Sequence, residues 1–341
     1  MTHPAIRTTV VGSYPVPDWL AALPSQQALI DATRVVFKTQ EMAGIDVVAD
    51  GELYRFDVNH PDTNGMIEYF TRPMGGIRSA ITRADIHAFA QLEGMGFRAE
   101  PAGVVEGAVD EGTLNLPRDY RRARSLTRHP MKFTLTGPHM LTKTLMDRHY
   151  ASRAELAMAM GGALGKQVAE IDADVLQVDE ANITGHPHEA EWAADSINFI
   201  LDAARSVKEK AVHLCFGNYG GQSIQKGQWK QLIGSFINRL HCDHVVLEFA
   251  FRGYDELAHF REQLDPRIAV GLGVIDGKVN TVETPDLVAS RIEQAAKILG
   301  DGRVRWVHPD CGFWMNKRSI ADRKMAVLVA GRDLYLGRAR C

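Results

Sequence analysis

The sequence has little cysteine, no excess of one charge and no long apolar run, and each shortage disfavours a class of protein. Four cysteines in 341 residues are too few for a disulfide framework, so we expect a reducing, cytoplasmic compartment. The 39 basic and 42 acidic residues give a net charge of −3 without a basic stripe, so no nucleic-acid partner is expected. No apolar run approaches the roughly 18 residues of a membrane span, and the first residues do not resemble a secretory signal.

Several common catalytic and metal-binding motifs are also missing. The chain has no C-x2-C pair, the usual source of ligands for a structural zinc site. It has no G-x-S-x-G nucleophile elbow, and the glycine-rich segment 217–221 lacks the lysine of a phosphate-binding loop. The glycines of segment 271–274 fall inside a strand-like run rather than between a strand and a helix. Triad hydrolases, nucleotide-binding folds and structural zinc modules are therefore disfavoured.

Short apolar runs alternate with longer amphipathic segments, a pattern typical of repeated βα units around a parallel sheet. The predicted strands are 8–11, 47–50, 131–136, 175–179, 211–215, 245–248, 268–274 and 304–307. The predicted helices are 28–43, 153–171, 190–207, 233–240, 254–264, 286–299 and 317–330. Eight strands with intervening helices predict one (β/α)8 TIM barrel over residues 1–341, with a doubly wound open sheet as the alternative.

Residues from about 51 to 130 are too many for an ordinary connection between a strand and a helix. They predict a long insertion after the second strand. On the active-site face of a barrel such an insertion shapes the substrate pocket, and the alternative is a mobile surface excursion.

Polar and reactive residues follow nearly every predicted strand. Because the active site of a (β/α)8 barrel lies at the C-terminal ends of its strands, we expect these residues to converge on one rim. They are Ser13, Asp50, Glu52, Asp179, Glu180, His213, Cys215, Glu248, Asp276, Asp310 and Cys311.

A catalytic zinc site is predicted at this rim. His213 and Cys215 are two residues apart in one strand, so their side chains point to the same side. Cys311 would bring a third soft ligand from elsewhere in the fold. Glu248 ends an apolar strand, where an unpaired carboxylate is costly, and is the predicted fourth ligand, exchangeable for an incoming thiol. The alternative for Glu248 is a salt bridge with Arg252 or with a lysine inside the barrel.

The remaining rim carboxylates have a different predicted task. Asp179 with Glu180, and Asp50 with Glu52, could hold a cationic amino group or orient a histidine; as an alternative, Asp179 or Glu180 caps the next segment. The other two cysteines are predicted to be bystanders: Cys242 lies just before a strand rather than at its end, and Cys341 is the last residue.

Taken together, these segments resemble the C-terminal catalytic domain of cobalamin-independent methionine synthase. The matching segments, in the family's order, are VGSYP at 11–15, DGE at 50–52, MIEYF at 66–70, TGP at 136–138, QVDE at 177–180, HLC at 213–215, LE at 247–248 and PDCG at 309–312. The resemblance implies a zinc ion held by His213, Cys215, Glu248 and Cys311. It implies that Ser13, Glu52 and Asp179 bind homocysteine, with Glu52 and Asp179 as catalytic residues. Zinc would present the thiol as a thiolate, which attacks an electrophilic methyl group.

The half of the site that would bind folate departs from the family. The family's histidine after an aspartate is replaced by Lys278 in segment 276–279, and its tryptophan after Gly-Pro is missing from 137–143. The methyl donor is therefore expected to be either methyltetrahydrofolate or a corrinoid. The alternative function is a zinc-dependent alkyltransferase for another thiol or electrophile, similar to epoxyalkane:coenzyme M transferases. A non-catalytic zinc protein and a metal-free decarboxylase-like barrel are further alternatives. Retention of Glu52 and Asp179 favours an amino-acid thiol.

Overall fold

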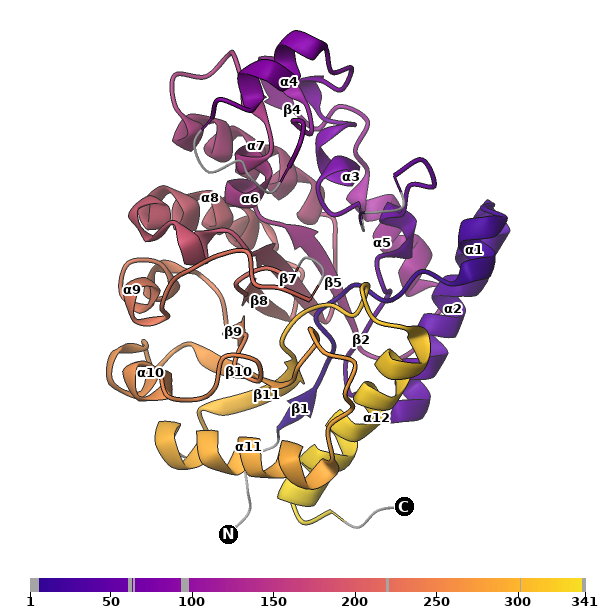
Figure 1. The fold of residues 1–341 in the computed structure, drawn as a ribbon, viewed down its shortest axis with the longest axis vertical. Coiled ribbons are helices and arrows are strands. Elements are labelled where there is room, and N and C mark those ends of the chain that lie inside the picture. Colours follow the sequence, from indigo (N-terminus) through magenta and orange to yellow (C-terminus); the bar gives the residue numbers. More distant parts are fainter. Residues whose placement is uncertain are drawn as a thin grey trace.

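Eight parallel strands form a sheet that closes into a barrel with helices around it (Figure 1). The computed structural model describes residues 6–60, 63, 65–92, 98–218, 221–300 and 302–338. The barrel strands are β1 (Arg7–Thr8), β2 (Val48–Ala49), β5 (Met131–Thr136), β7 (Val175–Glu180), β8 (Glu209–Leu214), β9 (His244–Leu247), β10 (Ala269–Ile275) and β11 (Val304–Pro309). They follow the order β1-β11-β10-β9-β8-β7-β5-β2, and parallel bridges from Thr9 to Val47 and from Ser13 to Gly51 join β1 to β2. The predicted barrel is confirmed.

The main helices lie where the amphipathic pattern predicts them, with one exception. The helices outside the insertion are α1 (Asp18–Ala22), α2 (Gln26–Ala43), α6 (Pro138–Lys143), α7 (Arg153–Val168), α8 (Ala190–Ala203), α9 (Lys230–Ile233), α10 (Leu257–Gln263), α11 (Pro285–Leu299) and α12 (Arg318–Tyr335). The predicted helix at 233–240 is wrong, because α9 ends before Gly234 and only a 3-10 turn, Ile237–Arg239, follows. Gly234 keeps helical dihedral angles (φ −75°, ψ −45°), and the backbone leaves the helical conformation at Phe236 (φ −125°, ψ −64°). At α11 the capping residue lies where the sequence pattern indicates a helix start, since Thr284 Oγ1 accepts the Leu287 N–H.

The predicted insertion after the second barrel strand is confirmed, and it has defined secondary structure. It contains a 3-10 turn (Leu53–Arg55), α3 (Glu68–Thr71), β3 (Gly75–Arg78), α4 (Arg83–Phe89), β4 (Val104–Asp110) and α5 (Leu116–Arg124). In a small separate sheet, β3 pairs with β4, and β4 pairs with β6 (Met146–Asp147), which belongs to the connection after β5. Buried Asp85 forms ion pairs with Arg78 and Arg148, and so ties the insertion to that connection. In Figure 1, α3, α4 and β4 lie together at the top of the view.

The barrel interior carries a chain of polar side chains that ends at the rim. Lys132 of β5 is buried and contacts the carbonyl oxygen of Val10, and its Nζ is 2.7 Å from Gln177 Oε1. The Gln177 amide donates in turn to the Val11 carbonyl oxygen at 2.8 Å and to Asp179 Oδ1 at 2.7 Å. Burial lowers the pKa of Lys132 to about 7. The lysine inside the barrel therefore orients Gln177, which supports a rim carboxylate.

Within the described ranges, no helix is long and apolar enough to cross a membrane.

Gln40 of α2 provides hydrogen-bond partners for the short strand β2. Its side-chain amide donates to the Ala49 carbonyl oxygen at 2.7 Å, and its Oε1 accepts the Ala49 N–H at 2.9 Å. Gln40 is buried, so water cannot replace these bonds. One side chain thus fixes the helix to the strand that precedes the insertion.

We predict that Gln40→Met destabilises the protein by about 1–3 kcal/mol, because two buried backbone groups lose their side-chain partner while helix propensity hardly changes. The free energy of unfolding in urea measures the effect. The matched control is Gln27→Met, at an exposed position of the same helix, which should change stability by less than about 0.5 kcal/mol. Equal losses in both variants would contradict the role given to Gln40.

Candidate metal and substrate site

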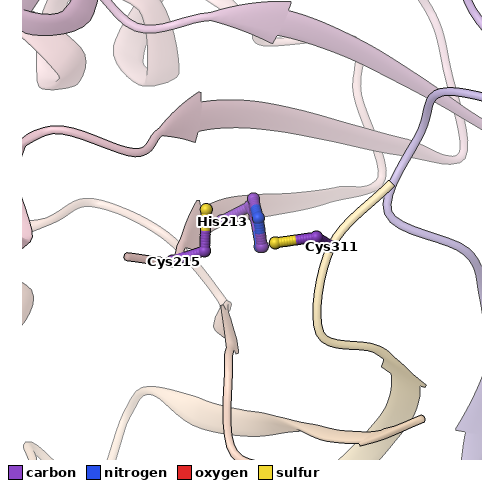
Figure 2. Close-up of side chains that lie close together, drawn as sticks. All are labelled: His213, Cys215 and Cys311. Carbon is purple, nitrogen blue, oxygen red and sulfur yellow. The ribbon is translucent and has the colours of Figure 1, made fainter. Parts of the chain in front are cut away.

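Three soft ligands converge at the C-terminal rim of the barrel. His213 lies in β8, and Cys215 is the first residue after the end of that strand. Because side chains alternate along a strand, these two side chains point to the same side. Cys311 comes from the segment after β11, and Figure 2 shows it reaching the other two from a separate part of the chain. The ligand atoms of these three buried residues all lie within 4.8 Å of one another. Sequence reasoning predicted this convergence, and the barrel produces it.

His213 is prepared for binding through its Nε2 atom. Its Nδ1 lies 3.0 Å from the carbonyl oxygen of Val246 on the neighbouring strand β9. A carbonyl oxygen only accepts hydrogen bonds, so Nδ1 must carry the proton. In the neutral ring the Nε2 lone pair can then bind a metal ion, and the same bond fixes the plane of the ring.

The two cysteines form an unequal hydrogen-bonded pair. A hydrogen bond from the Cys311 thiol lowers the pKa of Cys215 well below its ordinary value, and the protonated form of the nearby His213 lowers it further. The same hydrogen bond, together with burial, raises the pKa of Cys311. A thiolate, a thiol that can lose its proton and a neutral imidazole make a donor set that suits zinc.

Glu248, immediately after β9, lies beside this cluster with both carboxylate oxygens engaged. Its Oε1 lies 2.6 Å from Lys278 Nζ, and its Oε2 accepts the Phe216 N–H at 3.0 Å. Both side chains of the ion pair are fully buried, and loss of one partner of such a pair costs about 3–5 kcal/mol. The partner is not the predicted Arg252, which pairs with Glu256 instead. The role of Glu248 as a zinc ligand stays a prediction.

Asp310 links the ligand segments that follow β9 and β11. Its carboxylate accepts the N–H groups of residues 249–251 at 2.7–2.9 Å. These residues directly follow Glu248, and Asp310 directly precedes Cys311. One buried carboxylate therefore fixes two turns of the rim relative to each other.

Asp179 ends β7 beside the histidine ligand. It is the backbone partner of His213 in the pairing of β7 with β8. Its carboxylate accepts a hydrogen bond from the Gln177 amide, and burial raises the pKa of Asp179 to about 7. The charge of Asp179 raises the pKa of His213, and the charge of Glu52 raises the pKa of Asp179. A buried carboxylate supported by a neutral amide is suited to receive a cationic group from a ligand.

Glu52 is held by the chain in an unusual conformation. Its φ of 60° makes it the one non-glycine residue with a positive φ in the described part of the chain, a backbone conformation that costs energy. Its carboxylate accepts from Thr134 Oγ1 at 2.5 Å and pairs with buried Arg55 at 3.1 Å. Gly12 makes this placement possible, because a Cβ at that position would overlap Glu52 Oε1.

Ser13 lies between two other rim segments. Its backbone bridges to Gly51, and its carbonyl oxygen accepts the Phe313 N–H at 2.8 Å. Its hydroxyl rests against Gly312, where a Cβ would overlap it. Ser13 is therefore placed next to the segment of Cys311 and near that of Glu52, as predicted from the closure of a barrel.

Two buried cations of this rim have partners that sequence reasoning did not assign. Arg55 pairs with Glu52, and Lys278 pairs with Glu248. One sequence signal did point to Lys278. It lies in segment 276–279, which follows a predicted strand and differs there from the pattern of the family. Cys242, by contrast, lies just before β9, at the opposite end of the barrel, and Cys341 lies outside the described residues.

Comparison with known proteins assigns the family. The family model described as cobalamin-independent synthase, catalytic domain, matches residues 6–331, so the chain belongs to this family. It is 27% identical to methionine synthase of Sulfurisphaera tokodaii, over 97% of this chain and 93% of that protein. It is also 27% identical to methionine synthase of Thermococcus kodakarensis, over 98% and 94% of the two chains.

The fold comparison agrees. The solved structure of a B12-independent methionine synthase from Shewanella sp. W3-18-1, in complex with selenomethionine, matches with a TM-score of 0.75 at 23% identity. The match covers 97% of this chain and 98% of that one. The predicted family, barrel fold and enzyme class, a methyltransferase of the methionine synthase type, are confirmed.

We predict that Asp310→Ala lowers the free energy of unfolding by about 2–4 kcal/mol, because three backbone N–H groups lose a charged acceptor. Residues 249–251 should also exchange their amide hydrogens faster. Urea denaturation and hydrogen exchange measure the two effects. The control is Asp255→Ala, at an exposed position nearby, which should cost less than about 0.5 kcal/mol. A similar small loss in Asp310→Ala would rule out the linking role.

Proposed function

We propose that this protein is a zinc-dependent methyltransferase that methylates the thiol of homocysteine to give methionine, and that residues 1–341 act as one catalytic domain. The observation that carries the proposal is the buried cluster of His213, Cys215 and Cys311 at the rim of a barrel of this family. The names of the relatives, methionine synthases, point to the same reaction.

The three clustered residues would hold the zinc. His213 offers Nε2, and the cysteines offer two sulfurs that bind as thiolates. When bound, zinc lowers the pKa of a thiol and so presents it as the nucleophilic thiolate near neutral pH. Burial of the three ligands keeps water away from this nucleophile.

The rim carboxylates and Ser13 would hold the amino-acid end of the substrate. Glu52 already has a cationic partner in Arg55, whereas Asp179 is supported by a neutral amide. We therefore assign the substrate ammonium chiefly to Asp179, with Glu52 completing its surroundings. Asp179 lies beside His213, so an amino acid bound there brings its thiol towards the zinc ligands. Ser13 offers a hydroxyl next to Gly312.

The donor would be methyltetrahydrofolate or a methylated corrinoid. Methionine formation by the zinc-loaded protein, followed by mass spectrometry with homocysteine and each donor in parallel, tests the proposal. Methionine from either donor supports it and identifies the donor. Absence of methionine with both would overturn the assignment of acceptor and donor, and would favour another thiol or electrophile.

We expect Cys215→Ser and Cys311→Ser each to lose stoichiometric zinc and activity together, because either change removes one of three clustered ligands. Zinc content after dialysis, measured by atomic absorption, is the readout. Cys242→Ala is the matched control, since this cysteine is buried at the other end of the barrel and should keep its zinc. Full zinc occupancy in both Cys→Ser variants would exclude the proposed site.

Asp179→Asn should raise the Kd for homocysteine by about tenfold or more while zinc stays bound, because the substrate ammonium loses its carboxylate partner. Isothermal titration with homocysteine gives the Kd. The comparison thiol is 3-mercaptopropionate, which has no amino group and should bind both proteins alike. If the variant binds homocysteine as the native protein does, Asp179 has another role.

A further inference from the structure

A buried hydrogen-bond network leads from inside the barrel to the carboxylate that is assigned to the substrate ammonium. Lys132 Nζ lies 2.7 Å from Gln177 Oε1, and the Gln177 amide donates to Asp179 Oδ1 at 2.7 Å. Gln177 and Asp179 are two residues apart in β7, so their side chains point to the same side of the strand. Lys132 is the backbone partner of Val175, which precedes Gln177 by two residues, so the network rises through the barrel towards the rim.

The network allows the Gln177 amide only one orientation. A protonated lysine only donates hydrogen bonds, so the amide oxygen has to face Lys132, which is itself anchored by the carbonyl oxygen of Val10. The amide nitrogen then faces two acceptors, the Val11 carbonyl oxygen at 2.8 Å and the Asp179 carboxylate. A reversed amide would place its oxygen against both acceptors. Lys132 therefore determines that Gln177 donates to Asp179.

The rim end of the network is its most accessible part. Gln177 is 0% exposed and Lys132 is 2% exposed, whereas Asp179 is 7% exposed. Within the residues that the structure describes, no protein group donates to Asp179 Oδ2 and no protein cation pairs with the carboxylate. A ligand ammonium at Oδ2 would complete the partners of this buried group.

Ser13, the other residue assigned chiefly to the amino-acid end of the substrate, has anchors outside this network. Its backbone bridges to Gly51, and its carbonyl oxygen accepts the Phe313 N–H at 2.8 Å. Loss of the network would therefore release the Asp179 carboxylate and leave Ser13 in place.

We propose that Lys132 and Gln177 are positioning residues that aim the Asp179 carboxylate at the substrate ammonium, and so make the site select an α-amino thiol over a thiol without an amino group. The inference rests on the proposed function, in which Asp179 receives the ammonium of homocysteine. The bond from Gln177 to one carboxylate oxygen fixes the plane of the group before the substrate arrives. A carboxylate that could rotate would have to be ordered during binding, which lowers the affinity for the ammonium.

The test is isothermal titration of the zinc-loaded full chain with homocysteine and with 4-mercaptobutyrate, which is homocysteine without its amino group. Lys132→Met should raise the Kd for homocysteine by about fivefold or more, and should leave the Kd for 4-mercaptobutyrate within about twofold of native. Gln177→Met should act in the same way. A purely electrostatic role of Lys132 would have the opposite sign, because removal of a positive charge favours a cationic ligand.

The double variant shows whether Lys132 acts through Gln177. If it does, adding Lys132→Met to Gln177→Met should change the Kd for homocysteine by less than about twofold. The double variant leaves no lone buried ammonium, so it carries the test if Gln177→Met does not fold. Lys324→Met is the matched control, because it removes another fully buried lysine, on α12, and should keep the native ratio of the two Kd values.

Three results would overturn the inference. The first is a Lys132→Met protein that keeps or increases the native preference for homocysteine, and the second is an equal rise of both Kd values, which indicates a general structural role. The third is a double variant whose loss equals the product of the two single losses, which indicates independent actions. Circular dichroism and zinc content check each variant. A native protein that binds 4-mercaptobutyrate as tightly as homocysteine would instead refute the proposed assignment of the substrate, so the two failures are distinguishable.

Discussion

The parallel pairing of the barrel strands is the constraint on which the whole site depends. His213 and Cys215 lie at the end of β8 and Cys311 follows β11, so the pairings from β8 through β11 bring them together. The bridge between Thr9 and Val47 closes the barrel and carries β1 and β2 to the same rim. Because the side-chain period of a strand is two, a slip of one residue in β8 would turn both ligands away from the interior.

A rim that gathers so many buried ionisable groups must balance their charges. Arg55 balances Glu52, Lys278 balances Glu248, and backbone N–H groups hold Asp310. Asp179 is supported by a neutral amide, and in the proposed function the substrate ammonium completes its surroundings. In the proposed function, two charge requirements are thus met by ligands: a cation beside Asp179 and a metal ion held by the two cysteines and His213. Burial makes both requirements strong, since unpaired charges are costly in a dry interior.

Much of this arrangement could be predicted from local sequence pattern. Buried parallel strands read as short apolar runs, so all eight barrel strands were predictable, and the polar residues that follow them mark the rim. The helix predicted at 233–240 was wrong, because its apolar periodicity continues past Phe236, where the backbone leaves the helical conformation. The side sheet was not predictable either, since β4 pairs with β6 across the whole of β5.

The sequence by itself determined which faces and strand ends carry His213, Cys215 and Cys311, because side-chain alternation and strand order depend on local pattern. Only the tertiary structure decided the partner of Glu248. Pattern suggested Arg252 or a lysine inside the barrel, whereas the partner is Lys278 from the next loop around the rim. The physical reason is that a charge pair forms between groups that loops bring within hydrogen-bond distance, and periodicity gives the direction of a side chain without giving that distance.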